Sequence, residues 1–270
     1  MHEEGVQFRS QVLSALFDTL NDPQELVQLR LSIVTENAHS QRGDSWSMPE
    51  LYTFFGELDE IWLKPAQQNV TSLKLHCALF WGYIPNCNLR SVHFPSLKKL
   101  ELGNYIFSHD WQVDWICSHI TLQALAPDDC CIVSYTQAEG PVDEEDYYTD
   151  PLGEFGNHES DREENPHRWS EIFTQIECQL PNLKSFQFGS ANWQAEDPYI
   201  AFCAGMNPSP WISVYECREQ EREEEDETRN GNGQSPAPSI TESEWEHMLQ
   251  ADDEDEAAYQ RLVATVQGRA

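Results

Sequence analysis

Four side chains that could take part in acid–base or metal chemistry lie close together in the chain. They are His109, Asp110, Asp114 and His119. Apolar residues at helical spacing predict a helix over residues 108–119, and on a helix two residues four apart share a face. Asp110 and Asp114 could therefore share a metal ion. The structural alternative is that Ser108 or Asp110 caps the start of the helix while Asp114 is solvated. We favour it because spacing alone supports a metal.

A second candidate is the run Asp128-Asp129-Cys130-Cys131, which places two thiols beside two carboxylates. A nucleophilic cysteine needs a nearby base and a lowered pKa, and the sequence identifies neither. A cysteine just beyond a strand can instead fill an interior packing position as a structural residue. The eight cysteines of the chain form no Cys-x-x-Cys pair. We therefore expect reduced, mostly buried thiols with a structural role.

The sequence contains none of the motifs G-x-S-x-G, H-E-x-x-H, P-loop or dinucleotide fingerprint. The acidic runs at 144–146 and 252–256 lack the ligand spacing and the glycine of an EF-hand loop. We predict no catalytic residue, no metal site and no cofactor. A hydrolase that uses His109 and Asp110 is the weakest of the alternatives.

The elements that must position these residues follow from leucine spacing. Leu97, Leu100 and Leu102 fit L-x-x-L-x-L, and Leu122 and Leu125 open the same pattern again after the predicted helix. Applied to the whole chain, the pattern predicts five strands with centres at 29, 73, 100, 125 and 186. The two central steps, from 73 to 100 and from 100 to 125, match the period of a leucine-rich repeat, and the other two carry insertions. Residues 48–62 have helical spacing and are predicted as a helix.

Pro127 stands where the fourth repeat should have its third leucine. Because proline cannot donate to a strand ladder, we expect the fourth strand to end near Leu125.

These elements predict an α/β fold, namely an irregular leucine-rich-repeat-like solenoid with short parallel strands and helices, disordered acidic segments and a C-terminal helix. We divide the chain into an N-terminal helix (1–23), a repeat domain (24–212) with an acidic insertion (139–168), an acidic disordered linker (213–240) and a C-terminal helix (241–270). The acids at 252–256 weaken the middle of the last helix, so two helices are an alternative.

The net charge of −31 is concentrated in three windows, 139–164, 216–227 and 242–256, which hold 27 of the 47 acidic residues. Such runs are typical of solvated, disordered segments. Since phosphate contacts need Lys and Arg, the charge argues against binding to nucleic acid or an anionic membrane. No signal peptide or long apolar run is visible, so we expect a cytoplasmic or nuclear protein.

In a stack of repeats the leucines point inward, and the alternate residues lie on the opposite, concave face of the sheet. That face is the predicted partner-binding site. Its residues are Gln28, Arg30, Ser72, Lys74, His76, Lys99, Glu101, Ser185 and Gln187. Three cations against one acid make a mildly basic groove, which could select a protein partner or the chain's own acidic insertion. The alternative is an ordinary solvated sheet face.

Residues 94–105 (FPSLKKLELGNY) and 107–116 (FSHDWQVDWI) resemble the repeat region of filamentous-fungal F-box proteins. Trp62, the segments 65–69 (PAQQN) and 81–83 (WGY), and the segment 207–211 (NPSPW) fit the same family, so the resemblance covers about residues 24–212. It implies that the repeats choose a protein substrate for an F-box-type ubiquitin ligase adaptor.

The chain departs from that family at its start. Residues 1–20 contain no Leu-Pro opening, and the first repeat already begins at Leu26, which leaves too short a segment for a complete three-helix F-box. We expect a Skp-type adaptor as a partner only if an F-box lies upstream. The alternative is a stand-alone acidic leucine-rich-repeat scaffold without a role in ubiquitin transfer.

Overall fold

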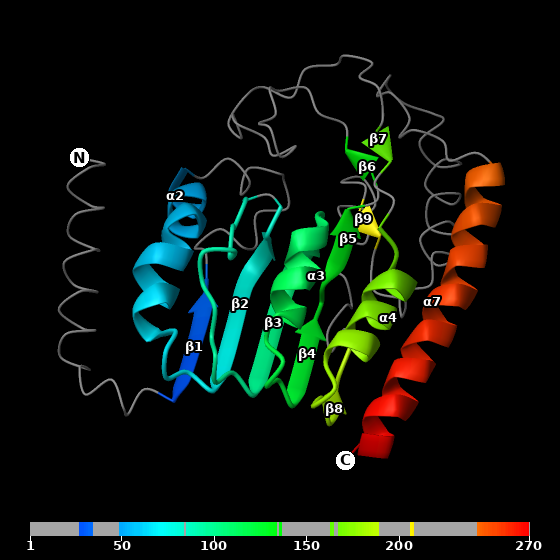
Figure 1. Cartoon of the computed structure of the whole chain (residues 1–270). Helices are drawn as coiled ribbons and strands as arrows, with labels where there is room; N and C mark the ends of the chain where they lie inside the picture. Colours follow the sequence, from blue (N-terminus) through cyan, green and yellow to red (C-terminus); the bar gives the residue numbers. More distant parts are fainter. Residues whose placement is uncertain are drawn as a thin grey trace, which may run out of the picture.

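A parallel sheet organises the computed structural model (Figure 1). The structure describes residues 27–34, 49–83, 85–133, 135–136, 163–164, 167–188, 206–207 and 242–269. Five strands stand in chain order, each parallel to its neighbour: β1 (Gln28–Ile33), β2 (Ser72–Trp81), β3 (Lys99–Phe107), β4 (Ala124–Asp128) and β8 (Ser185–Phe186). The expected α/β class with short parallel strands is confirmed.

The apolar residues of the five strands stand opposite one another. Leu29 faces Leu73, Leu73 faces Leu100, Leu100 faces Leu125, and Leu125 faces Phe186. All five predicted strand centres therefore share one row of the sheet. A slip of one residue would turn the apolar set of a strand to the other side, so the leucines specify the register.

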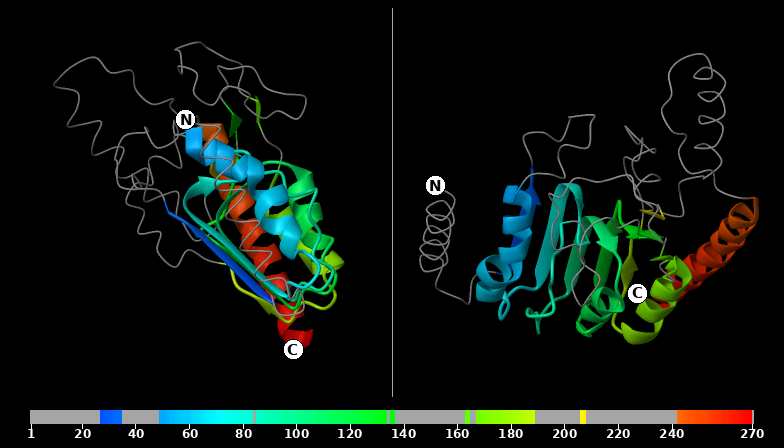
Figure 2. Two further views of the ribbon diagram at one scale, coloured as in Figure 1. Left: turned by 90° about the vertical axis from the view of Figure 1, so that its left-hand side faces the viewer. Right: turned by 90° about the horizontal axis from the view of Figure 1, so that it is seen from above.

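The helices between the strands cover one side of this sheet (Figure 2). They are α2 (Pro49–Glu57), which continues into a π-helical turn η2 (Leu58–Leu63) and a 3₁₀ turn η3 (Lys64–Ala66), then α3 (Asp110–Cys117) and α4 (Trp169–Gln179). The predicted helices at 48–62 and 108–119 are confirmed. None of the described helices is at once long enough and apolar enough to cross a membrane.

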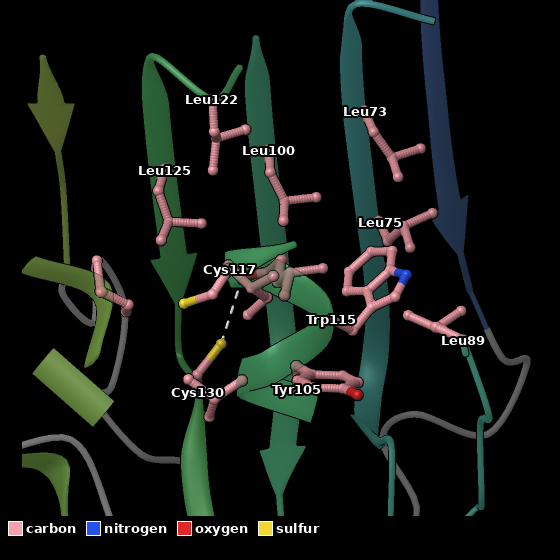
Figure 3. Close-up of a cluster of buried hydrophobic side chains, with 14 of the residues drawn as sticks. Leu73, Leu75, Leu89, Leu100, Tyr105, Trp115, Cys117, Leu122, Leu125 and Cys130 are labelled. Carbon is pink, nitrogen blue, oxygen red and sulfur yellow. Dashed lines mark hydrogen bonds between the residues drawn. The ribbon is translucent and has the colours of Figure 1, made fainter. Parts of the chain in front are cut away.

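The core fills the layer between the sheet and these helices. The leucines of β2, β3 and β4 point into it together with Trp115 of α3 (Figure 3), and Leu73, Leu100 and Leu125 are almost wholly buried. The indole N–H of Trp115 donates to the carbonyl of Val92 at 2.7 Å. This hydrogen bond ties α3 to the loop that precedes β3.

One pair of short strands extends the sheet at the carboxyl ends of β3 and β4, and a second pair forms a separate two-stranded sheet. Strand β5 (Cys131–Val133) runs parallel to the end of β3 and antiparallel to β9 (Met206–Asn207), while β6 (Tyr135–Thr136) pairs with β7 (Glu163–Glu164). Two residues at this end adopt left-handed backbone conformations, Asn104 with φ of 58° and Asp129 with φ of 50°. Each lies one position beyond the last pair of the β3–β4 ladder, Gly103 and Asp128, so Asn104 is within β3 and Asp129 directly follows β4.

The expectation that Pro127 ends the fourth strand is wrong. Strand β4 continues to Asp128, and Pro127 is buried opposite Leu102. The N–H of Ala124 donates to Lys98 on the β3 side, and bonding sides alternate along a strand, so the nitrogen of Pro127 is directed toward β8. Because β8 ends at Phe186, the missing donor does not interrupt the β3–β4 ladder.

The C-terminal helix α7 (Glu242–Arg269) is continuous, so the two-helix alternative is wrong. Its second half packs along α4 through Ala258, Leu262 and Val266, which are buried. Asp255 accepts a hydrogen bond from the N–H of Ser170 at 2.7 Å, at the start of α4. Arg269 donates to the carbonyls of Leu180 at 2.9 Å and Glu177 at 3.1 Å, at its end. An anion and a cation from α7 thus complement the dipole of α4.

The predicted helix within residues 1–23, most of the acidic insertion 139–168 and the linker 213–240 lie outside the described residues.

Leu100→Ala tests the register. The side chain is fully buried, so we expect the free energy of unfolding to fall by about 2–5 kcal/mol in urea denaturation. Lys99→Ala, the next residue on the opposite face, is the control and should cost less than about 1 kcal/mol. Equal small losses for both variants would contradict the register.

Candidate functional site

The structure brings the predicted partner-binding residues onto one surface, the side of the sheet away from α2, α3 and α4. Strand register arranges them in rows. Gln28, Ser72 and Lys99 stand side by side and continue through Ala124 to Ser185, while Arg30, Lys74 and Glu101 form the next row. His76 stands opposite Gly103, and the N–H of Gln187 donates to the carbonyl of Leu125 at 3.0 Å, just beyond β8. These side chains are half-buried or exposed.

Sequence reasoning missed three positions on this surface: Gly103, Ala126 and Asp128. Ala126 faces Glu101 and Asp128 faces Gly103 across the β3–β4 ladder. The two β4 residues were missed because Pro127 was expected to end that strand. The repeat period itself could have identified them, since each lies one repeat after its β3 partner.

Glu101 is held between two lysines at the centre of the surface. Lys74 Nζ lies 2.7 Å and Lys99 Nζ lies 2.6 Å from its carboxylate oxygens. Burial acts to raise the pKa of Glu101, but the hydrogen bonds and charges of Lys74 and Lys99 outweigh burial and lower this pKa. Arg30 is exposed and forms no ion pair with the residues that the structure describes. The surface therefore carries three cations and two carboxylates, with Asp128 at its far end.

Gly103 is required by the side chain that lies across it. A Cβ built on Gly103 would overlap Cδ2 of His76 and meet its Cγ at 3.0 Å. The His76 ring therefore rests directly on the backbone of β3, where any larger residue would displace it.

Gly103→Ala tests this contact. We expect a loss of about 1–3 kcal/mol in the free energy of unfolding, because the new methyl group overlaps the base of the His76 ring. His76→Ala in the same chain removes the overlap and should restore most of the loss. Urea denaturation of both variants measures the two effects, and a double variant no more stable than Gly103→Ala would contradict the contact.

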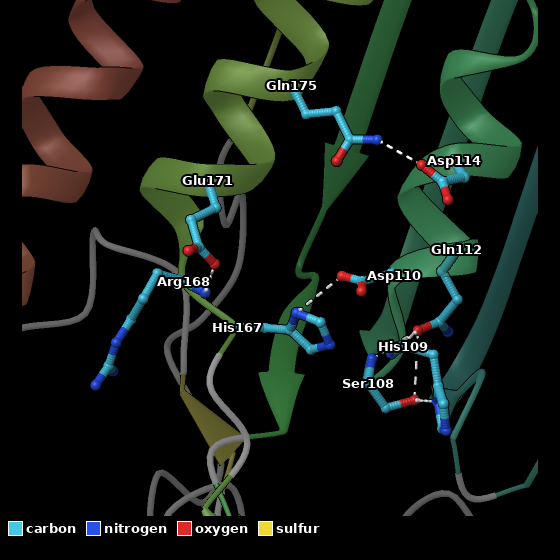
Figure 4. Close-up of polar contacts among 9 residues, drawn as sticks. All are labelled: Ser108, His109, Asp110, Gln112, Asp114, His167, Arg168, Glu171 and Gln175. Carbon is cyan, nitrogen blue, oxygen red and sulfur yellow. Dashed lines mark hydrogen bonds and ion pairs between the residues drawn. The ribbon is translucent and has the colours of Figure 1, made fainter. Parts of the chain in front are cut away.

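Asp110 and Asp114, which the sequence predicted on one helical face, line an open groove between α3 and α4, and each contacts a different residue. Asp110 lies 3.4 Å from His167 Nδ1, and Asp114 accepts a hydrogen bond from Gln175 Nε2 at 2.7 Å (Figure 4). The groove has a volume of about 740 Å³ and is lined by Asp110, Asp114, Ser170, Glu171, Thr174, Gln175, Cys178 and Gln179. Among the described residues, no group of three or more His, Cys, Asp or Glu could hold a metal ion.

Neither Ser108 nor Asp110 caps α3, which corrects the sequence interpretation. The N-cap is His109, and the Gln112 side chain folds back so that its Oε1 accepts from the backbone N–H of His109 at 2.9 Å and of Ser108 at 2.6 Å. Tyr105 and the Ile106 carbonyl accept from the Gln112 amide. The buried glutamine thus satisfies two backbone donors at the start of the helix.

Ser108 Oγ lies 2.7 Å from His109 Nδ1, the distance expected of a nucleophile and its base. Three observations indicate that this contact is structural and does not pair a nucleophile with its base. Ser108 is buried, its hydroxyl is also 3.3 Å from Gln112 Oε1, and Asp110 is directed toward His167 (Figure 4).

His119 is a buried structural residue. Its Nδ1–H donates to the Trp115 carbonyl at 2.8 Å, and its Nε2 accepts from the N–H of Phe94 at 3.2 Å. The second hydrogen bond requires the neutral ring, because only an unprotonated Nε2 can accept. Burial and the nearby His93 lower the pKa of His119 to about 4.

Acid should therefore weaken the fold through His119. Its pKa is about 6.5 in the unfolded chain and about 4 in the folded one, so as pH falls through this window the unfolded state takes up a proton that the folded state does not. We expect this group to remove about 2 kcal/mol of stability between about pH 8 and pH 5. His119→Asn does not titrate, so urea denaturation should show a smaller acid loss than wild type. Equal losses would contradict the assignment.

The cysteines after β4 are placed as structural residues. Cys130 and Cys131 are buried, and burial raises the pKa of both thiols, that of Cys130 to about 12. The Cys130 thiol lies 3.5 Å from the Leu102 carbonyl. A thiol that stays protonated is a poor nucleophile.

Comparisons of the chain with family models, with curated proteins and with solved structures found no match. The geometry of the residues themselves therefore carries the functional argument.

Proposed function

We propose that this chain is a non-catalytic protein-interaction module that binds its partner on the face of the parallel sheet that the described helices leave uncovered. One observation carries the proposal: the described helices α2, α3 and α4 cover only one side of the sheet (Figure 2). All-parallel sheets are nearly always covered on both sides. The second side of this sheet carries rows of polar and charged side chains. Such side chains suit a surface that is exposed to water in the free protein and contacts a partner in the complex.

The fold supports a repeat-like interpretation of this module. Strands β2, β3 and β4 keep one register, with Leu73, Leu100 and Leu125 at equivalent positions. Asn104 and Asp129, each one position beyond the pair Gly103–Asp128, both have a left-handed backbone conformation. We therefore propose a short, irregular solenoid of leucine-rich-repeat type, in which each added strand enlarges a single binding face.

The resemblance of residues 94–116 to fungal F-box proteins directs the choice of partner. On that basis we propose that the module recognises substrates for an F-box-type ubiquitin ligase adaptor. The stand-alone scaffold differs from this in one respect, the absence of a Skp-type adaptor from the complex. Co-purification of the full chain with a Skp-type adaptor separates the two functions.

Photo-crosslinking tests the face itself. A photoreactive amino acid at Gln28 or at Ser185, near opposite edges of the sheet face, should crosslink the full chain to the same partner protein in a cell extract. The same group at Glu60 in η2, on the helical side, is the control and should not. Arg30→Glu should reduce the crosslink from Gln28. A partner captured only from position 60 would contradict the proposal.

A further inference from the structure

We propose that the sheet face recognises an acidic, extended segment of its partner protein, an inference that rests on the proposed function and specifies the chemistry of the ligand. The surface is defined by Arg30, Lys74, Glu101 and Lys99 with their polar or small neighbours on β1 to β8, and Asp128 lies at its far end.

The lysines of this surface already bind one carboxylate, that of Glu101. Its carboxylate receives both ammonium groups, at 2.7 Å from Lys74 and 2.6 Å from Lys99. Lys99 keeps about half of its side chain exposed even so, at 52%. An ammonium has three donors, and a single carboxylate leaves donors available to a second one.

Arg30 extends this charge to the edge of the sheet. It stands directly beside Lys74 in the β1–β2 ladder, at the strand spacing of about 4.8 Å. It is exposed and forms no ion pair within the part of the chain that the structure describes. A planar guanidinium binds a carboxylate through two parallel hydrogen bonds. A carboxylate bound at Arg30 would therefore offset the like charges of the neighbours Arg30 and Lys74, as Glu101 does on the other side of Lys74.

The shape of the surface favours an extended segment over a helix. Residues that bind amphipathic helices line apolar grooves, whereas the side chains here are polar or small. Ala124 and Ala126 on β4 form a low floor between the longer side chains of β3 and Gln187. Gln28, Ser72 and Ser185 offer neutral hydrogen-bonding groups along the neighbouring row.

The number of charges favours a carboxylate segment over nucleic acid. Strong nucleic-acid binding involves about 6–10 phosphate contacts, and this surface has three cations, two of them already paired with Glu101. Two or three carboxylates match that number.

Fluorescence anisotropy with the full chain tests the proposal, using a labelled peptide of alternating Glu and Ser. We expect it to bind, and the matched peptide of Gln and Ser to bind at least about tenfold more weakly. Arg30→Glu should weaken Glu-peptide binding about tenfold or more. Lys64→Glu makes the same charge change on the helical side, and its affinity should stay within about twofold of wild type. Circular dichroism melting checks that both variants fold.

Several outcomes overturn the proposal. Equal binding of the Glu and Gln peptides would show that charge is not recognised, and equal losses for Arg30→Glu and Lys64→Glu would show that only net charge matters. Tighter binding of a single-stranded thymidine oligonucleotide would assign the face to nucleic acid.

Failure of the wild-type chain to bind the Glu peptide also overturns the proposal. One variant then identifies the reason for the failure. In it the five acids Asp143, Glu144, Glu145, Asp146 and Asp150 are changed to their amides. If this variant binds, the chain's own acidic segment is the ligand of the face. If neither binds while the partner still crosslinks from Gln28, the acidic ligand is wrong and the proposed function stands. Loss of the crosslink as well removes both.

Discussion

The structure depends on one constraint, the alignment of buried apolar side chains across successive parallel strands. Leu73, Leu100 and Leu125 occupy one row and are almost wholly buried beneath the helices. Since side chains alternate along a strand, the placement of these leucines also decides which residues reach the other face. Arg30, Lys74 and Glu101 share a row because the leucines on either side of them do. Core and candidate site are thus two results of the same periodicity.

This dependence explains what the sequence could predict. Strand centres, register, the helix after β3 and the members of the polar face follow from the alternation along each strand and from the regular return of the leucine pattern, which local sequence records well. Pro127 was misjudged because its effect depends on which neighbour its nitrogen faces. That neighbour is β8, which follows β4 in the sheet but comes only after α4 in the chain. A local rule has no access to so distant a partner.

The polar contacts that sequence reasoning missed also depend on partners outside the local sequence. Gln112 caps the start of α3, and its side-chain amide donates hydrogen bonds to Tyr105 and to the carbonyl of Ile106. The tautomer of His119 is set by Phe94 and Trp115. Each residue type was visible in the sequence, but its role depends on partners that only the folded chain selects. The two aspartates of α3 show the opposite error. Their spacing suggested a shared metal ion, but in the structure Asp110 contacts His167 and Asp114 contacts Gln175.

The contacts between α7 and α4 have a consequence for how the molecule is made. The hydrogen bond from Ser170 to Asp255 joins positions 85 apart in the chain, and those from Arg269 to Leu180 and Glu177 join positions 89 and 92 apart. During synthesis, the strands from β1 to β4 can assemble as they emerge from the ribosome, because their contacts are closer in sequence. The end of α4 remains without its cation until Arg269 has been translated. The contacts at the α4 end can therefore form only after α7 has been synthesised.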